Sequence, residues 1–276
     1  MRAQRVDLME ELYFLKIGGS VITDLSKPYT AKMEEIRRVL SEIKEAKAKK
    51  GFEIIIGHGS GSFAHLPAKE YNVPAGIINE KSRKGATLTY LAAKELNNIF
   101  VKEAIDLGID VFPFSPSSFG IAEESMLSNG IVEHIKTTIE RGFIPVTYGD
   151  VVIDKKKGVA IASTEEVFRF LAIKMKPSKV FLATDVDGVF DKDPEKNSDA
   201  RLVNVVDASN INEIIKSTDS SSKRIDVTGG MRNKVMRLYD ISKNTGAMCY
   251  IFNGTKEGNI RKMLIGELER YTLVKA

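Results

Sequence analysis

The chain has 276 residues, of which 43% are hydrophobic and 28% are charged, an ordinary balance for a globular protein of one domain or of two lobes sharing a sheet. One cysteine and three histidines exclude a disulfide scaffold and a Cys/His-rich zinc cluster. No apolar run approaches the length of about 18 residues that spans a membrane, and residues 1–11 lack a signal-peptide core. We therefore expect a cytoplasmic protein without membrane contact. A net charge of +4 is too small and scattered to indicate nucleic-acid binding, but it allows a local site for a small anion.

Segments typical of strands and of helices alternate along the sequence. Apolar runs rich in β-branched and aromatic residues predict strands, and apolar residues at helical spacing predict helices. The predicted strands are residues 12–17, 54–56, 111–114, 144–147, 159–162, 180–183 and 248–252. The predicted helices are residues 32–50, 87–107, 131–141, 165–174 and 234–243, and a Ser-rich surface loop is expected over 216–224.

This alternation favours βαβ units, so the predicted fold class is α/β, with an open, mostly parallel β-sheet sandwiched between helices. Ligands of such sheets bind beyond the carboxyl ends of the strands, where almost all the short Gly-rich segments fall. The sequence shows no internal repeat and no long linker, which predicts a single domain over residues 1–276.

Two glycine-rich segments follow the first two predicted strands. Residues 16–20, Lys-Ile-Gly-Gly-Ser, place a lysine and flexible backbone where an anion could bind, although a plain β-turn fits equally well. Residues 57–65, Gly-His-Gly-Ser-Gly-Ser-Phe-Ala-His, offer backbone, hydroxyl and imidazole donors to a phosphate. The second segment matches neither a Walker A loop nor a Rossmann fingerprint, whose frame fails at Ala64. A flexible loop with chance histidines is its alternative interpretation.

Two further segments follow later in the chain. Residues 183–190, Ala-Thr-Asp-Val-Asp-Gly-Val-Phe, lack the ligand series of an EF-hand. They predict a loop that contacts the ribose or base of a nucleotide, and a solvated turn is the alternative interpretation. Residues 226–234, Asp-Val-Thr-Gly-Gly-Met-Arg-Asn-Lys, put Lys234 in the expected first turn of a helix. Because a cation there opposes the helix dipole, an anionic ligand explains it better than helix stability does. A solvent-facing lysine is the alternative.

The order of these segments resembles the amino-acid kinase superfamily and, within it, the isopentenyl phosphate kinase family. The resemblance covers about residues 12–270 and is carried by residues 16–24, 58–65, 116–119, 149–154, 183–189 and 226–231. It implies an N-terminal lobe of about residues 1–175 that binds the acceptor phosphate, a C-terminal lobe of about 176–276 that binds ATP, and a homodimer. The implied reaction transfers the γ-phosphoryl group of Mg-ATP to isopentenyl phosphate, the last step of an alternative mevalonate route.

The resemblance also implies roles for individual residues. Lys16 and Lys234 would act on the transferring phosphoryl group, Glu165 would position these lysines, and His65 rather than His58 would contact the acceptor phosphate. The implied acceptor-phosphate residues are Gly59, Ser60, Gly61, Ser62, His65, Gly149 and Asp150. The implied ATP residues are Lys16, Gly18, Gly19, Ser20, Thr184, Asp185, Gly188, Thr228, Gly229, Gly230, Met231 and Lys234. Backbone donors are expected from Gly18, Gly19, Gly59 and Gly61, and Mg²⁺ would be held by phosphates and water rather than by protein ligands.

Five positions depart from the family pattern. Leu25 stands where a second lysine usually follows, Ser60 and Ala64 replace glycines, and Thr164 and Glu165 replace Gly and Asp of a Ser-Gly-Asp-Asp motif. These changes cluster around the acceptor loop and the lysines. A kinase for another small phosphate, phosphonate or carboxylate therefore remains an alternative, as does a nucleotide-binding regulator without turnover. A redox enzyme fits the alternation of elements but not the loops.

Overall fold

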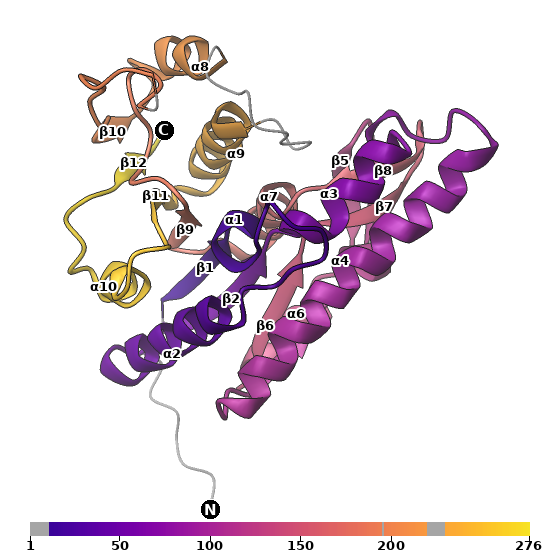
Figure 1. The fold of residues 1–276 in the computed structure, drawn as a ribbon. Helices are drawn as coiled ribbons and strands as arrows, with labels where there is room; N and C mark the ends of the chain where they lie inside the picture. The colour runs from indigo at the N-terminus through magenta and orange to yellow at the C-terminus, as the bar shows by residue number, and fades with distance from the viewer. Residues whose placement is uncertain (1–10, 195, 220–229) are drawn as a thin grey trace, which may run out of the picture.

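The computed structural model describes residues 11–194, 196–219 and 230–276, and its centre is an eight-stranded sheet (Figure 1). The strand order is β10-β12-β11-β9-β1-β2-β6-β3. The strands are β1 Leu12–Ile17, β2 Glu53–His58, β3 Val111–Pro113, β6 Ile144–Tyr148, β9 Lys179–Thr184, β10 Val205–Val206, β11 Met248–Asn253 and β12 Thr272–Val274. Every neighbouring pair is parallel except β11 with β12, so the predicted mostly parallel sheet is confirmed.

Helices cover both faces of this sheet, as the sequence predicted. On one face the core includes side chains from α1 Gly19–Ile22, α2 Met33–Lys49, α3 Gly61–Glu70, α4 Glu80–Asp106 and α10 Asn259–Ile265. On the other face it includes side chains from α6 Glu133–Glu140, α7 Thr164–Met175, α8 Ile211–Asp219 and α9 Gly230–Thr245. Within the described part of the chain, no helix has the length and apolar character needed to cross a bilayer.

A second, smaller sheet has the order β5-β4-β7-β8 and packs its inner side chains against α7. Its strands are β4 Gly120–Glu123, β5 Met126–Gly130, β7 Asp150–Asp154 and β8 Gly158–Ala162, and the short helix α5 Pro116–Phe119 precedes it. Of these strands the sequence predicted only the last. β4 and β5 carry Gly, Asn and Glu, which are poor strand formers on their own, whereas the Val-Val-Ile centre of β7 is a strand-forming pattern that the prediction overlooked.

Two helices begin several residues before their predicted starts, and a third, α8, was not predicted. α4 begins at residue 80, seven residues before the predicted start, because Asn79 and Ser82 form a capping box there. α9 begins at Gly230, so Lys234 lies in the second turn and not in the first. α8 continues to residue 219, so the loop predicted over 216–224 is wrong for residues 216–219. Residues 220–224 lie outside the described residues.

The pleat of β1 places one lysine on the α7 side of the sheet. Tyr13, Leu15 and Ile17 belong to the core on the α2 and α4 face, whereas Phe14 belongs to the core on the α7 and α9 face. Because successive side chains of a strand point to opposite faces, Lys16 shares the side of Phe14. It stands at the carboxyl end of the strand, where this fold class binds its ligands.

Candidate active site

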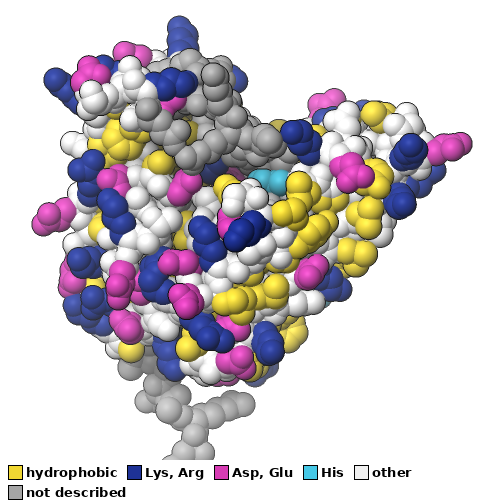
Figure 2. Space-filling view, in the orientation of Figure 1, with side chains coloured by type: hydrophobic (Ala, Val, Ile, Leu, Met, Phe, Trp, Pro, Cys, Tyr) yellow, Lys and Arg dark blue, Asp and Glu magenta, His cyan; other side chains and the backbone are white. Residues whose placement is uncertain are grey.

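The predicted loops converge because the strands before them end at the same edge of the sheet. In the parallel register, Ile17 of β1 lies between His58 of β2 and Ala183 of β9. The segments that follow these residues therefore start side by side. Figure 2 shows a hollow between the part of the surface over α8 and α9 and the part over α3 and α4, with histidine atoms at its edge.

A buried ion pair between Lys16 and Glu165 lies at this edge. The two side chains are only 8% and 5% exposed. Glu165 reaches the lysine from the first turn of α7, which is fixed to β2 because the Thr164 hydroxyl donates to the His58 carbonyl at 2.7 Å. Thr164 and Glu165 are two of the departures from the family pattern, and they act together here. Thr164 bonds α7 to β2, and Glu165 forms the ion pair with Lys16.

Lys234 of α9 is a second cation close to Glu165. Burial alone would raise the pKa of the Glu165 carboxyl, but the charges of Lys16 and then Lys234 outweigh it, so the pKa lies below its ordinary value. The Lys234 ammonium also donates to the Gly230 carbonyl at 3.4 Å, one turn earlier in α9. Two ammonium groups thus lie close to one carboxylate, an arrangement that suits an anionic ligand.

The first two glycine-rich loops contact each other through their backbones. A Cβ atom on Gly19 would lie 2.5 Å from the Gly61 nitrogen, and one on Gly59 would lie 2.7 Å from the Gly19 nitrogen. Gly61 has a φ of +46°, and a Cβ atom there would lie 2.0 Å from the Thr23 hydroxyl. Glycine is needed at these positions because the two loops pack directly on each other.

Two of the four glycine N–H groups expected to serve a phosphate are already engaged. The Gly18 N–H donates to the Ala183 carbonyl at 2.8 Å, and the Gly59 N–H donates to the Ile17 carbonyl at 2.9 Å. This differs from the predicted donor role of Gly18 and Gly59, because both groups join neighbouring strand ends. Gly19 and Gly61 are the first residues of α1 and α3, where N–H groups have no partner within the helix.

The two serines of the second loop also have partners within the protein. The Ser62 N–H donates to the Thr23 hydroxyl at 3.1 Å, and its hydroxyl accepts from the Thr30 N–H at 3.3 Å. These bonds assign Ser62 to holding the segment after α1, which differs from the predicted phosphate contact. The Ser60 hydroxyl donates to the Gly149 carbonyl at 2.9 Å, so it joins the second loop to another predicted acceptor residue.

The two histidines of the second loop occupy different environments. His58 is fully buried between the rings of Phe100 and Tyr148, and its Nε2 atom lies 3.1 Å from the Asn97 side-chain oxygen. Burial lowers its pKa to about 4, so the imidazole is neutral at neutral pH. The other ring nitrogen, Nδ1, lies 3.3 Å from the Gly59 carbonyl, and the single N–H of the neutral ring donates to one of these two oxygens at a time.

His65 lies in the second turn of α3 and is half-buried. It is four residues after Gly61, so the two share one face of the helix. Side chains of a helix lean toward its N-terminus, which in α3 is the end where Gly61 packs against Gly19. The partial exposure of His65 contrasts with the complete burial of His58.

Asp150, a predicted acceptor residue, is a buried carboxyl at the start of β7 with 2% exposure. Burial raises its pKa to about 6, although the N–H groups of Ser117 and Val151 donate to it at 3.2 and 2.8 Å. These bonds join β7 to α5.

The loop after β9 carries the predicted ATP residues Thr184, Asp185 and Gly188. The Thr184 hydroxyl donates to the Val186 carbonyl at 2.9 Å, which shapes the turn. Gly188 has a φ of 158°. A Cβ atom on this residue would lie 2.5 Å from the Thr272 hydroxyl, so glycine is needed for the backbone to pass this close to Thr272. Asp185 is half-exposed.

Four predicted ATP residues precede or open α9. Thr228 and Gly229 lie outside the described residues. Gly230 and Met231 are the first two residues of the helix, and both are partly exposed.

Sequence reasoning missed a charged cluster beside this loop. The Asp187 carboxylate lies 2.7 Å from the Lys256 ammonium and 2.6 Å from Arg270, and it accepts from the Asn253 side chain at 3.1 Å. Asp187 stands two residues after Asp185, but its partners come from the loop after β11 and from the residues before β12. Of these partners, Asn253 is the last residue of β11 itself. No local sequence pattern could reveal these contacts, since the strand order brings the residues together.

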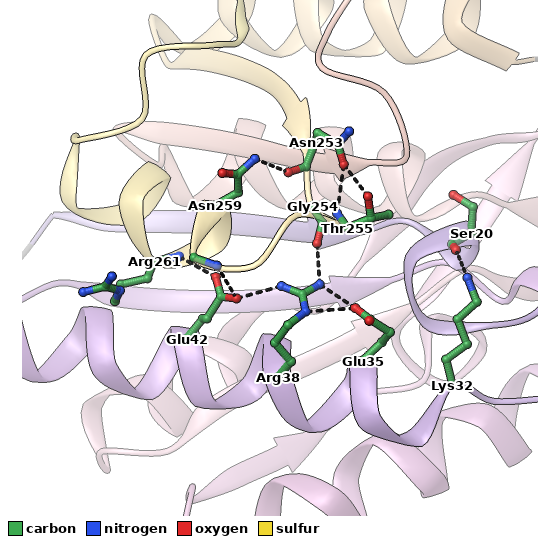
Figure 3. Close-up of polar contacts among 11 residues, drawn as sticks. Ser20, Lys32, Glu35, Arg38, Glu42, Asn253, Gly254, Thr255, Asn259 and Arg261 are labelled. Atoms are coloured by element: carbon green, nitrogen blue, oxygen red, sulfur yellow. Dashed lines mark hydrogen bonds and ion pairs between the residues drawn. The ribbon is translucent and has the colours of Figure 1, made fainter.

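Figure 3 shows how α2 is tied to the same edge. Arg38 donates to the Gly254 carbonyl at 2.7 Å and pairs with Glu35 and Glu42, while Glu42 also accepts from the Gly258 N–H at the start of α10. These contacts hold the loop after β11 against the first half of the chain.

The second family lysine, absent at Leu25, is not replaced by its nearest neighbour in sequence. The Lys27 side chain is 71% exposed, and its ammonium lies 3.9 Å from the Asp24 carboxylate. The Lys32 ammonium instead donates to the Ser20 carbonyl at 3.0 Å, beside the first glycine loop (Figure 3). No sequence pattern marks Lys32, because the segment before it returns to α1 only in the folded chain.

The fold and this arrangement define a class of protein. The profile of the amino acid kinase family matches residues 11–253, and the chain belongs to that family. It is accordingly a phosphotransferase.

Within this family, the chain is similar to proteins of one named activity. The chain is 34% identical over 271 residues to the isopentenyl phosphate kinase of Methanothermobacter thermautotrophicus, covering 95% of this chain and 98% of that protein. It is 34% identical over 267 residues to the isopentenyl phosphate kinase of Methanocaldococcus jannaschii, covering 94% and 96%. A solved structure of isopentenyl phosphate kinase aligns with a TM-score of 0.82 at 31% identity, over 96% of this chain and 100% of that one.

Proposed function

We propose that this chain transfers the γ-phosphoryl group of ATP to the phosphate of isopentenyl phosphate, giving isopentenyl diphosphate and ADP. The observation that carries the proposal is the pair of lysines, Lys16 and Lys234, on the single carboxylate of Glu165. The similarity to isopentenyl phosphate kinases over nearly the whole chain supports this choice of acceptor.

The proposed chemistry needs cations and alignment more than a general base. A phosphate monoester is largely a dianion at neutral pH, so its oxygen is already a nucleophile. That oxygen forms a bond to the γ-phosphorus as the bond to the bridging oxygen breaks, and the electron pair leaves with ADP. Lys16 and Lys234 stabilise charge on the moving group, and Glu165 holds both ammonium groups in place.

The acceptor phosphate is proposed to bind between the glycine loops and His65. Gly61 opens α3 against Gly19, and His65 lies on the same helix face, so its imidazole faces an anion held there. Ser60 and Gly149 shape this side through their mutual hydrogen bond. Residues of about 1–175 would thus bind the acceptor, and residues of about 176–276 would bind ATP.

Mg²⁺ is proposed to accompany ATP and to neutralise charge on its phosphates. The described residues contain no cluster of three or more His, Cys, Asp or Glu side chains that could hold a metal ion. We expect the ion to be bound mainly through phosphates and water, as Mg²⁺ commonly is at nucleotide sites. A homodimer and the last step of an alternative mevalonate route are further parts of the proposal, supported by the family resemblance. A cytoplasmic location is also proposed, from the composition of the N-terminal residues.

The test is ADP formation by the purified chain with Mg-ATP and a panel of acceptors. The panel contains isopentenyl phosphate, dimethylallyl phosphate, a small phosphonate and glutamate. The proposal predicts the highest kcat/KM for isopentenyl phosphate. A preference for the phosphonate or the carboxylate would reassign the acceptor, and nucleotide binding without turnover of any acceptor would instead identify a regulator.

A further inference from the structure

The first turn of α7 carries two adjacent buried carboxylates that face different partners. Glu165 faces Lys16 and Lys234. Glu166, the next residue, is 2% exposed and bonds to a separate set of groups. Successive residues of a helix are rotated by roughly 100°, which lets one turn serve both clusters.

Glu166 and Arg169 together close the outer edge of β5. Arg169 donates to the two Glu166 oxygens at 2.7 and 3.0 Å. The Leu127 N–H donates to Glu166 at 2.8 Å, and the Leu127 carbonyl accepts from Arg169 at 3.0 Å. Because β5 is an edge strand of the small sheet, this ion pair supplies the partners that a further strand would supply. The small sheet, which also contains Asp150, is thereby fixed to α7.

Glu166 also reaches α9. Its Oε2 atom lies 3.2 Å from Nε of Arg237, whose side chain is 31% exposed. Arg237 is three residues after Lys234, so both cations lie on neighbouring positions of one helix face. α9 therefore gives one cation to each carboxylate of α7: Lys234 to Glu165 and Arg237 to Glu166.

We propose that Glu166 and Arg237 are positioning residues for phosphoryl transfer, whose ion pair holds α9 where Lys234 meets Glu165 and the transferring group. The proposal rests on the proposed function. The pair acts through Lys234 and not on the substrate. Glu166 also holds the small sheet through its bond to Leu127. It therefore connects the proposed acceptor site, to which the small sheet contributes Asp150, with α9, the helix that carries Lys234. The rate of transfer depends on the position of Lys234 relative to the transferring group, because a misplacement of about 1 Å can cost about 10²-fold in rate.

A purely stabilising role predicts a different outcome for Arg237. Arg169 already compensates the Glu166 charge, so removal of Arg237 leaves no unpaired buried charge. A partly exposed ion pair contributes little to stability. If the pair matters mainly for position, its loss should reduce turnover more than it reduces stability.

The test is Arg237→Met in the full chain, assayed with Mg-ATP and isopentenyl phosphate. We expect kcat to fall about 10- to 100-fold, and KM to change by less than about threefold. The thermal midpoint should shift by less than about 5 °C. Arg237→Lys should recover part of the rate because it restores the charge. The matched control is Lys243→Met, which removes an exposed cation from the last turn of the same helix and should retain the wild-type rate.

A second readout is independent of the acceptor. Brief acetylation by acetic anhydride, followed by peptide mass spectrometry, measures the reactivity of each lysine. Arg237→Met should raise the labelling of Lys234 severalfold and leave that of Lys16 unchanged. Unchanged labelling of Lys234 overturns the proposal, whether or not kcat falls, and so does a wild-type kcat in Arg237→Met. If the wild-type chain phosphorylates no acceptor, the proposed function fails, but the labelling still decides whether Arg237 positions Lys234.

Discussion

The cations around Glu165 and the glycine loops beside them lie at the same edge of the sheet but use their polar groups differently. Lys16 and Lys234 both lie close to the carboxylate of Glu165, so cations outnumber carboxylates among these three side chains. In the loops, the N–H groups of Gly18 and Gly59 bond to neighbouring strand ends. The cation cluster is thus built to attract an anion, while much of the loop structure holds the edge together.

This difference separates two kinds of mutational effect. Substitutions in the cation cluster should change the rate of transfer, because charge on the moving group is stabilised there. Substitutions of loop groups that bond within the protein should change stability and leave the rate nearly intact.

Lys234→Met should reduce kcat about 10²- to 10³-fold, the usual cost of losing one group that stabilises charge in the transition state. The acceptor KM should change much less, since the contact strengthens only during transfer. Steady-state kinetics with saturating ATP measures both. A rise in KM with an unchanged kcat would show that Lys234 binds only the ground state.

Lys16→Met should cause a similar loss of kcat, but it also leaves Glu165 with one fewer cation in a buried site. The double variant Lys16→Met/Glu165→Gln is the matched control, because it removes both charges of the pair. It should regain much of the stability lost in Lys16→Met and none of the activity. Recovery of activity in the double variant would contradict a direct role for Lys16.

His65→Ala should lower kcat/KM for the acceptor by about 10- to 100-fold, the equivalent of losing a charge-assisted contact of about 1.5–3 kcal/mol. His65→Gln keeps a donor and should retain more activity. Kinetics at varied acceptor concentration, with ATP saturating, measures the effect. A larger loss of kcat/KM in His58→Gln than in His65→Ala would reverse the assignment of the two histidines.

His58 should make stability depend on pH. Its pKa of about 4 in the folded chain lies below its ordinary value, so the unfolded chain binds the proton first as the pH falls. The folded state should therefore lose about 2 kcal/mol between pH about 7.5 and about 5, relative to a His58→Gln variant. Urea unfolding of both proteins at the two pH values measures this difference. Equal pH dependence in the two proteins would place His58 in contact with solvent.

Ser62→Ala should have the smallest effect. It removes hydroxyl bonds to Thr30, which contribute about 1 kcal/mol of stability, and the acceptor kcat/KM should stay within about twofold of the wild-type value. Thermal unfolding and steady-state kinetics check the two parts. A loss of kcat/KM without a loss of stability would restore Ser62 to the phosphate site.

The sequence predicted the parts of the fold and site that depend on local pattern. The alternation of elements predicted the parallel sheet, and Lys16 was located at a strand end by its place before two glycines. The distinction between His58 and His65 came from the family resemblance, because both flank the same loop. For His58 the structure adds a physical reason, because the ring is buried between Phe100 and Tyr148 and is not exposed to a ligand.

The rest depends on contacts between residues far apart in the chain. Ser62 looks like a phosphate ligand by its neighbours, but the segment around Thr23 and Thr30 folds back onto it. Glu166 stands at the start of a predicted helix, but Leu127 and Arg237 reach it from β5 and α9. No local pattern in one sequence could indicate these partners, since strand order and helix packing bring them together.

The central claim, transfer to the acceptor phosphate by the lysines around Glu165, is tested most directly by ³¹P NMR of the reaction mixture. Wild-type chain and Lys234→Met are each incubated with Mg-ATP and isopentenyl phosphate. The account predicts that the wild type converts the monophosphate resonance into a pair of diphosphate resonances, with one ADP formed for each diphosphate. Lys234→Met should form the same product far more slowly. ADP with inorganic phosphate and unchanged isopentenyl phosphate, or equal rates in the two proteins, would contradict the account.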